Sequence, residues 1–397
     1  MMDCMSDLPL LHWHDAAGPQ QALWRSENGS PVPRRVVLAD DTLSADQAYR
    51  LACEGTALLW QGDFQNARQL LQAMARRADR PSRKKARSGV APASSLRPHE
   101  RFHLHRQAQA QRARTLGMLL IPLQADYSVA LRRAPDLRMA CQQAWGDSAG
   151  QACVSSLREL LGVVGAYEWR KKGVEIPALG IGPHNRIHAH YGVFSPVRGE
   201  YVQLVAQAPL PASTALAFDI GVGTGVLSAV LARRGVAHIV ATDLSERALA
   251  CAADNLKQLG LASRVQLQAT AFFPEGQAGL IVCNPPWVPA RAQSPIEQAV
   301  YDEGCQMLRG FLAGVAAHLL PQGEAWLILS DVAEHLGLRS RSELLQWIQA
   351  GGLEVVDRLD TRPEHRKSQD PSDPLHAARA AEVTSLWRLR AQSVASA

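Results

Sequence analysis

The distribution of apolar and polar residues changes at about residue 214. Beyond this point short apolar runs alternate with longer segments whose apolar residues recur at helical spacing. The apolar runs predict strands at 215–221, 238–245, 264–272, 278–284, 324–330, 353–359 and 382–390. The segments between them predict helices at 225–235, 246–260, 299–320 and 339–352. This alternation predicts an α/β domain over 201–397, with a mostly parallel sheet and helices on both faces.

The N-terminal part of the chain has a different pattern. Leu, Ala and Met recur at helical spacing over 44–80, with a break near Gly62, and again over 99–118 and 136–162. Ser44 is in position to cap the first of these helices. We therefore expect residues 1–155 to form a mainly helical domain with a role in substrate recognition.

Short β-leaning runs separated by Gly and Pro follow, and they predict a β-hairpin connector at 156–200. His188 and His190 alternate on one expected strand, with His184 nearby. A metal site needs a further ligand at suitable spacing, and this segment does not offer one. Ordinary polar packing is the preferred interpretation, so no metal is expected.

Composition narrows the class of protein. The chain of 397 residues is 47% apolar and 20% charged, as in ordinary globular proteins. None of its apolar runs approaches the roughly 18 residues of a membrane span, and the first residues lack the pattern of a signal peptide. The seven cysteines are scattered, with no CxxC pair. These features predict a cytoplasmic protein with reduced thiols and no membrane partner.

Positive charge is concentrated in one segment, although the whole chain carries only +5. Residues 76–87 hold seven basic side chains against one acid, Asp79, and they open a basic linker at 76–98. Further arginines follow at 97, 101, 106, 112 and 114. Two interpretations remain open, a surface for nucleic-acid phosphates and a solvated basic loop.

A glycine-rich turn follows the first predicted strand of the C-terminal region. It reads Asp219-Ile220-Gly221-Val222-Gly223-Thr224-Gly225. Glycines permit positive φ and let a ligand approach the backbone. A dinucleotide fingerprint would require glycine at Val226, and the leading acid favours a cationic ligand over a pyrophosphate. Asp243, at the end of the next strand, is in position to accept hydrogen bonds from both hydroxyls of a ribose.

A second motif, Asn284-Pro285-Pro286-Trp287, ends the fourth strand, because prolines cannot continue a sheet ladder. The Asn284 side-chain oxygen and the Pro285 carbonyl can each accept one N–H of a flat amine or amide. Pro286 stiffens the corner, and Trp287 offers a flat face on which a base can stack, worth about 1–3 kcal/mol. The alternative is a plain proline turn with a buried Trp.

Together, "DIGVGTG", "ATDLS" and "IVCNPPW" resemble motifs I, II and IV of class I S-adenosylmethionine-dependent methyltransferases, which have a Rossmann-like seven-stranded sheet. More narrowly, they resemble the methyltransferase small-domain group, which includes the HemK/PrmC-type release-factor glutamine methyltransferases and several ribosomal RNA methyltransferases. The resemblance covers roughly 190–390, and residues 1–155 lie outside it.

This resemblance implies S-adenosyl-L-methionine as the cofactor. It places Asp219 and glycines 221, 223 and 225 beside the methionine part of the cofactor, and Asp243 at its ribose. The cofactor-binding residues that it further implies are Leu244, Thr270 and Asn284. Thr270 stands where the family often has an acid near the adenine. The family motif usually ends in Tyr or Phe, whereas Trp287 keeps the flat ring without a phenol.

The hypothesis that follows is an N-methyltransferase acting on a planar exocyclic nitrogen of an RNA base, in ribosomal or transfer RNA. Asn284, Pro285, Pro286 and Trp287 would form its catalytic site. One alternative is a protein methyltransferase acting on a glutamine of a release factor, so the expected partners are RNA, the ribosome or a release-factor protein. A second alternative is a cofactor-binding module without catalysis, and a small-molecule substrate also stays open.

Overall fold

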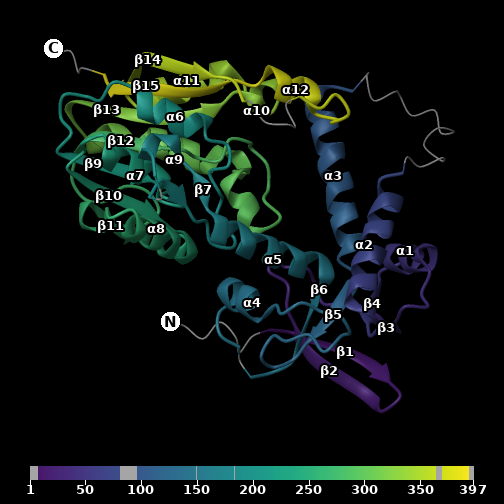
Figure 1. Cartoon of the computed structure of the whole chain (residues 1–397). Helices are drawn as coiled ribbons and strands as arrows, with labels where there is room; N and C mark the ends of the chain where they lie inside the picture. Colours follow the sequence, from purple (N-terminus) through teal and green to yellow (C-terminus); the bar gives the residue numbers. More distant parts are fainter. Residues whose placement is uncertain (1–7, 81–95, 149, 183, 364–368, 393–397) are drawn as a thin grey trace. The chain divides into compact units, whose positions relative to one another are not determined.

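The strands predicted after residue 214 form one seven-stranded sheet in the computed structural model (Figure 1). The structure describes residues 8–80, 96–148, 150–182, 184–363 and 369–392. It contains two compact units, an N-terminal unit of 1–96 and 103–168 and a C-terminal unit of 97–102 and 169–397. Among the described residues no helix has the length and apolar character needed to cross a membrane.

The sheet of the C-terminal unit has the strand order β11-β10-β9-β12-β13-β15-β14. Its strands are β9 (Leu216–Ile220), β10 (His238–Asp243), β11 (Val265–Ala269), β12 (Ala278–Cys283), β13 (Leu319–Ser330), β14 (Leu353–Thr361) and β15 (Thr384–Ala391). Adjacent strands from β11 to β13 pair in parallel, whereas β15 is antiparallel to both of its neighbours. The predicted mostly parallel sheet is therefore confirmed.

Helices cover both faces of this sheet. On one face lie α6 (Glu200–Gln207), α7 (Val226–Arg233) and α8 (Glu246–Gln258), and on the other α9 (Gln306–Gly314) and α11 (Arg341–Ala350). Helices α10 (Val332–His335) and α12 (His376–Ala381) pack in a third cluster. Short 3-10 turns lie at Pro177–Leu179, Ala262–Arg264, Pro295–Ala299, Glu303–Cys305 and Val315–His318.

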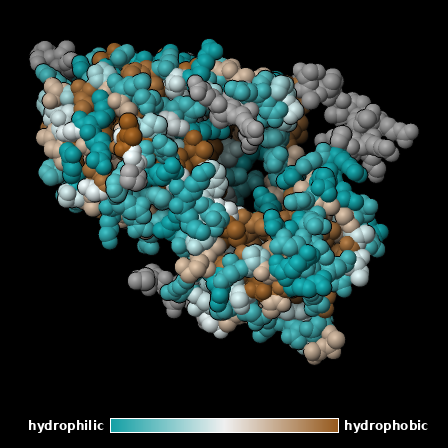
Figure 2. Space-filling model, viewed as in Figure 1, coloured by the Kyte–Doolittle hydropathy of each residue, from teal (hydrophilic) through white to brown (hydrophobic). Residues whose placement is uncertain are grey.

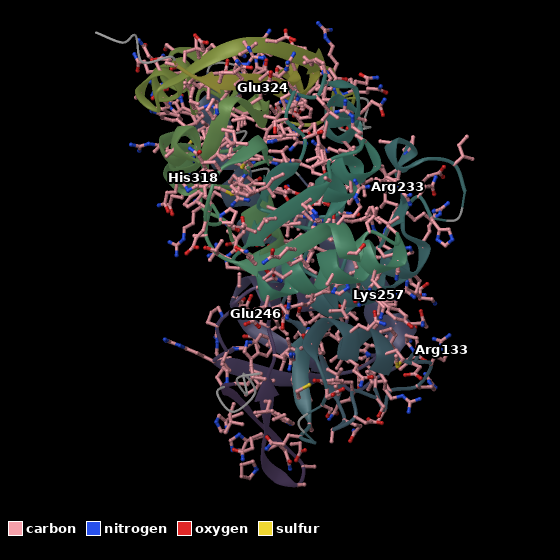
Figure 3. All side chains as sticks on the ribbon, turned by 90° about the vertical axis from the view of Figure 1, so that its left-hand side faces the viewer. Arg133, Arg233, Glu246, Lys257, His318 and Glu324 are labelled. Atoms are coloured by element: carbon pink, nitrogen blue, oxygen red, sulfur yellow. The ribbon has the colours of Figure 1, made fainter. Side chains whose placement is uncertain are left out.

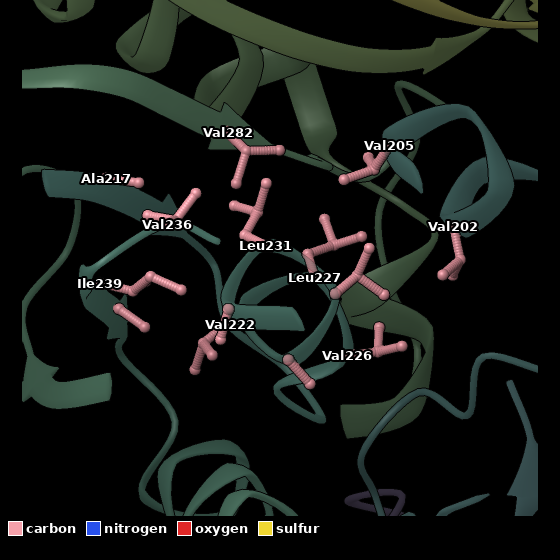
Figure 4. Packing of buried hydrophobic residues seen from close by; sticks show 14 of the residues in the cluster. Val202, Val205, Ala217, Val222, Val226, Leu227, Leu231, Val236, Ile239 and Val282 are labelled. Atoms are coloured by element: carbon pink, nitrogen blue, oxygen red, sulfur yellow. The ribbon is translucent and has the colours of Figure 1, made fainter. Parts of the chain in front are cut away.

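Alternate residues of the central strands enter two separate cores, as the pleat of a strand requires. Ala217 and Val282 face α6, α7 and α8, in the cluster that Figure 4 shows. Their chain neighbours Phe218 and Cys283 face α9 and α11. Burial on both faces explains why the central strands read as nearly continuous apolar runs.

The predicted helix at 299–320 begins later than expected. Tyr301 bridges to Val288, Cys305 adopts a positive φ of 55°, and α9 starts only at Gln306. Asp302 explains this start, because its carboxylate accepts backbone N–H bonds from the first turn of α9. The acid thus caps the helix instead of lying inside it.

The prediction of a mainly helical N-terminal domain is wrong. This unit contains a six-stranded sheet of order β1-β2-β6-β5-β4-β3. Its strands are β1 (Leu10–Asp15), β2 (Gly18–Trp24), β3 (Arg35–Ala39), β4 (Thr56–Trp60), β5 (Leu119–Leu123) and β6 (Cys153–Ser156). Its helices are α1 (Ala45–Cys53), α2 (Phe64–Ala78), α3 (Pro98–Leu116), α4 (Arg138–Trp145) and α5 (Leu157–Lys172), of which α3 and α5 extend into residues of the C-terminal unit.

The error has a specific cause at β4. This strand is buried at every position, and a short buried apolar run has the same appearance as a buried helical segment. The chain leaves α1 at Gly55, which has a φ of 79°, and the predicted break near Gly62 lies just before α2 begins at Phe64. The predicted cap is confirmed, because the Ser44 side chain accepts a hydrogen bond from Gln47 N.

Residues 156–200 begin with helix α5 and then contain a small antiparallel pair, β7 (Val174–Glu175) with β8 (Arg186–Ile187). Of the basic linker predicted at 76–98, residues 76–78 belong to α2 and α3 begins at Pro98. Residues 81–95 lie outside the described residues.

Hydrophilic side chains predominate on the face that Figure 2 shows, with apolar groups between them, as is usual for a protein surface.

Candidate active site

Strand register brings the two sequence motifs together at the carboxyl end of the sheet. In the pairing of β9 with β12, Ile220 lies opposite Cys283, and in the pairing of β9 with β10 it lies opposite Thr242. The next residue of each strand is therefore Gly221 in the middle, with Asn284 on one side and Asp243 on the other. Ligands of open α/β sheets bind at such strand ends.

The glycine-rich turn is fastened to the neighbouring strand by its backbone. The N–H groups of Gly221 and Val222 both donate to the Thr242 carbonyl, each at 2.9 Å. Gly225 N donates to Val222 O at 2.8 Å and closes the turn before α7. The turn therefore has a defined shape before any ligand arrives.

The three glycines of the turn differ in what surrounds them. A Cβ on Gly221 would lie 2.7 Å from Met307 Cε, and one on Gly225 would lie 3.2 Å from Ala252 Cβ. Their φ values are 80° and 79°, which side chains rarely adopt. A Cβ on Gly223 would meet nothing nearer than a backbone oxygen at 4.0 Å. The positive φ thus favours glycine at these two positions, where neighbours also lie close, whereas Gly223 presents bare backbone to open space.

Asp219 lies beneath this turn and is only 1% exposed. Its Oδ2 accepts a hydrogen bond from Ser228 Oγ of α7 at 2.6 Å. Burial raises the pKa of Asp219 to about 6, although the Ser228 bond opposes the rise, and the nearby charge of Asp243 adds to it. The carboxylate is therefore ionised at neutral pH and has few neutralising groups of its own.

Asp243 ends β10 with its carboxylate held by backbone groups. Oδ2 accepts from Gly223 N at 3.1 Å, and Oδ1 accepts from Ser245 N at 2.9 Å. A carboxylate offers about four acceptor positions, so two remain for a ligand. The side chain thus links the second strand to the glycine turn and retains the capacity to bind hydroxyl groups.

Asn255 of α8 is a residue of this site that the sequence did not reveal. It is 1% exposed, and its Nδ2 donates to the Thr224 carbonyl of the turn at 3.0 Å. The same amide bonds both backbone groups of His188, at 2.8 and 3.3 Å. One buried carboxamide therefore holds the glycine turn to the segment that precedes α6.

The histidines of the connector are engaged in hydrogen bonds. His188 Nδ1 lies 2.6 Å from the Arg170 carbonyl, and His190 Nε2 lies 3.0 Å from Asp254 Oδ2. Burial lowers the pKa of His190, and the Arg170 charge lowers it further. Among the described residues no cluster of His, Cys, Asp and Glu has the arrangement of a metal site.

The second motif forms a rigid corner after β12. The Asn284 side-chain oxygen accepts a hydrogen bond from Trp287 Nε1 at 2.9 Å. Beyond the corner, Val288 N donates to Val300 O at 3.1 Å, and Asp302 N donates to Val288 O at 2.9 Å. Both Asn284 and Trp287 are half-buried.

The indole of Trp287 packs where three apolar clusters meet. It contacts the clusters on both faces of the sheet and a third one formed by Phe102, Val288, Val332, Leu336, Leu375 and Ala378. Asp302, which accepts N–H bonds from the first turn of α9, also fixes this neighbourhood, since α9 carries Met307, whose Cε lies 2.7 Å from where a Cβ on Gly221 would be. Neither contact was visible in the sequence, because a cap residue is expected directly before the first helical residue and Asp302 lies four residues before Gln306.

The two remaining predicted residues lie at adjacent strand ends. Leu244 follows Asp243 and is 75% exposed. Thr270 follows β11 and is half-buried, with its N–H donating to Gln268 O at 3.1 Å. Both lie at the carboxyl edge where an extended ligand leaving Asp243 would pass.

The sheet order, the glycine turn with its two acids and the Asn-Pro-Pro-Trp corner together define a class I methyltransferase domain, for which S-adenosylmethionine is the cofactor. A family model described as the methyltransferase small domain matches residues 184–339. The chain belongs to this methyltransferase small-domain family.

Curated relatives carry two different names. The chain is 36% identical over 168 residues to a release factor glutamine methyltransferase of Cereibacter sphaeroides, a match covering 38% of this chain and 58% of the relative. It is 30% identical over 176 residues to a tRNA1(Val) (adenine(37)-N6)-methyltransferase of a Shewanella species, covering 41% of this chain and 71% of the relative. The chain thus spans between about half and three quarters of the length of these relatives.

Among solved structures, one match is a methyltransferase of Thiobacillus denitrificans in complex with S-adenosyl-L-homocysteine. Its sequence identity is 18% and its TM-score 0.35, and the match covers 50% of this chain and 92% of that structure.

Proposed function

We propose that this chain transfers a methyl group from S-adenosylmethionine to a planar exocyclic nitrogen of an RNA base. The observation that supports the proposal most is the strand register, which sets the Asn284 carboxamide beside the glycine turn. A cofactor bound over that turn would thus have a hydrogen-bond acceptor for the target nitrogen next to it.

The residues present fit the cofactor. Its methionine part has an amino group that carries positive charge, and the ionised Asp219 lies beneath the turn where that part would bind. Asp243 has two free acceptor positions for the ribose hydroxyls, and Gly223 exposes its backbone. Leu244 and Thr270 would border the adenine. When bound, S-adenosylmethionine supplies a methyl group attached to a cationic sulfur.

Asn284 and Pro285 would supply the selectivity for nitrogen. An exocyclic amine is a poor nucleophile because its lone pair is delocalised into the ring. Two acceptors, the Asn284 oxygen and the Pro285 carbonyl, hold its two N–H groups and direct the lone pair away from the ring plane. The same acceptors stabilise the positive charge that develops on nitrogen, so most of the rate effect comes from positioning and electrostatics. The proton then leaves to water.

Charge favours RNA as the substrate. Helix α3 carries Arg101, Arg106 and Arg114 against a single acid, Glu100, in addition to Arg112, which pairs with Asp79. Phosphate contacts from such side chains account for much of the affinity for nucleic acid. The name of the Shewanella relative, a tRNA adenine-N6 methyltransferase, supports the same substrate class.

A second candidate is the methylation of a protein glutamine. The name of the Cereibacter relative supports it, and a glutamine carboxamide presents the same flat NH₂ group to Asn284 and Pro285. For either substrate we infer a reducing compartment such as the cytoplasm, because cysteines 53, 141, 153, 251, 283 and 305 are free thiols.

Methyl transfer from labelled S-adenosylmethionine into an extract of cells that lack this protein tests the proposal, with parallel digestion by RNase and by protease. Label that RNase removes is the expected result. Label that only protease removes would favour the glutamine candidate. If the protein binds the cofactor but transfers no label, it would be a cofactor-binding module without catalysis. Asn284→Ala should abolish most turnover with a nearly unchanged cofactor dissociation constant, whereas Asp243→Ala should raise that constant first.

A further inference from the structure

The hydrogen bond between Trp287 and Asn284 has a consequence for the orientation of the carboxamide. An indole nitrogen donates and never accepts, so the group of Asn284 that faces it must be the oxygen. The donor–acceptor distance is 2.9 Å, which is typical of a well-formed bond. Turned by a half rotation, the carboxamide would present its NH₂ to the indole N–H, and two donors would face each other.

We propose that Trp287 is a positioning residue that selects the orientation of the Asn284 carboxamide in which the oxygen is available to the target nitrogen. This inference rests on the proposed function, since it concerns the same acceptor. A carbonyl oxygen has two lone pairs, so after accepting the indole N–H it still accepts one N–H of the substrate. The Pro285 carbonyl accepts the other.

The surroundings of Trp287 suit this role. The ring is wedged among three apolar clusters, and the backbone directly after it is fastened by the bonds between Val288 and residues 300 and 302. A ring that cannot turn offers its N–H in one fixed direction. The half-buried Asn284, in contrast, has a terminal torsion that is intrinsically broad and needs an external partner to choose between its two orientations.

A phenylalanine at position 287 would retain a flat ring and lose only this donor. Stacking on a substrate would therefore persist in Trp287→Phe, while the carboxamide would lose its fixed orientation. An aspartate at position 284 provides the complementary change. Its two oxygens are equivalent, so a carboxylate presents an acceptor in either orientation and needs no partner to orient it.

The first test reads the hydrogen bond without any substrate. Protein labelled with ¹⁵N-tryptophan gives one indole N–H resonance for each of its nine Trp residues, and Trp287→Phe identifies the one that belongs to Trp287. Asn284→Ala should shift that resonance upfield and speed its exchange with deuterium. Asn284→Asp should shift it downfield, because a charged acceptor forms a stronger bond. Trp326, whose indole donates to Glu324 at 3.1 Å, is the internal control and should not move.

The second test is a double-mutant cycle on methyl transfer into the RNA fraction of the extract. With Asn284 present, Trp287→Phe should lower kcat roughly three- to tenfold, the equivalent of one ordinary hydrogen bond, with an unchanged dissociation constant for the cofactor. In the Asn284→Asp background the same change should lower kcat less than about twofold. Equal losses in both backgrounds would show that Trp287 acts only by stacking or packing, and would overturn the inference.

The two tests separate this inference from the proposed function. If the wild-type protein labels no RNA, the substrate proposal fails, and the indole resonance still decides whether Trp287 holds Asn284. An indole resonance that stays in place in Asn284→Ala would refute the positioning role even if RNA is methylated.

Discussion

The hydroxyl of Ser228 should control the pH at which the cofactor binds. Ser228 Oγ donates to the buried Asp219 at 2.6 Å, and the pKa of Asp219 is raised by burial to about 6. If Asp219 binds the amino group of the ligand, as proposed, only its ionised form attracts that group, so affinity should be constant above about pH 7 and fall as the pH drops through 6. At pH 5 about ten carboxyls are protonated for each ionised one, which predicts roughly tenfold weaker binding.

Ser228→Ala removes a hydrogen bond that favours the charged form, so the pKa of Asp219 should rise further. A hydrogen bond to a charged group contributes roughly 1.5–3 kcal/mol, and one pKa unit corresponds to about 1.4 kcal/mol. The midpoint of the affinity profile should therefore move upward by about one to two pH units. The substitution deletes one buried oxygen, so the loss of packing is small.

Isothermal titration calorimetry with S-adenosylhomocysteine between pH 5 and 8.5 measures this midpoint. This probe has the same amino group and is not consumed. Ser385→Ala is the matched control, because it removes a similar 2.7 Å hydroxyl bond, to Asp360, on β15. If Ser228→Ala left the midpoint where it is in the wild type, Asp219 would not be the group that binds the cationic end of the ligand.

Two further predictions concern stability. Glu324, labelled in Figure 3, is fully buried and accepts hydrogen bonds from Arg388 at 2.8 and 2.9 Å. Glu324→Ala would leave this arginine without its buried partner, so it should lower the free energy of unfolding, measured by urea titration, by about 3–5 kcal/mol. Asp357→Ala removes the exposed partner of the same arginine and should cost less than about 1 kcal/mol; equal effects would contradict the importance of burial. Gly225→Ala places a Cβ 3.2 Å from Ala252 Cβ on a residue whose backbone φ is 79°, so it should lower the free energy of unfolding by at least about 1–2 kcal/mol. An unchanged urea midpoint of unfolding would show that the turn relaxes freely.

Several parts of the site were predictable because they follow from local pattern and one general rule. The apolar runs at β9, β10 and β12 define strands, and parallel strands place their carboxyl ends at one edge. Asp219, Asp243 and Asn284 each stand within one residue of such an end. Their proximity therefore required only that β10, β9 and β12 be neighbours, which the strand order of the structure shows.

Other features depended on the tertiary structure. The apolar run at β4 fits a helix as well as a strand, because a strand buried on both faces has no alternation to distinguish it. The late start of α9 depends on Asp302, whose carboxylate accepts the N–H groups of Gln306 and Met307, although the helical spacing of apolar residues begins earlier. The secondary structure of β4 is therefore set by neighbours that are distant in the sequence, and the start of α9 is set by hydrogen bonds that periodicity does not show.

The sequence alone therefore determined the class of the C-terminal unit and its cofactor, and it singled out the acids and the amide of the candidate site, since these depend on residue type and spacing. Only the tertiary structure decided which partner each of them has. Ser228 reaches Asp219, Asn255 reaches the glycine turn, and the indole of Trp287 turns toward Asn284. Such hydrogen bonds depend on rotamers and on the packing of separate elements, and neither leaves a periodic signal in the chain.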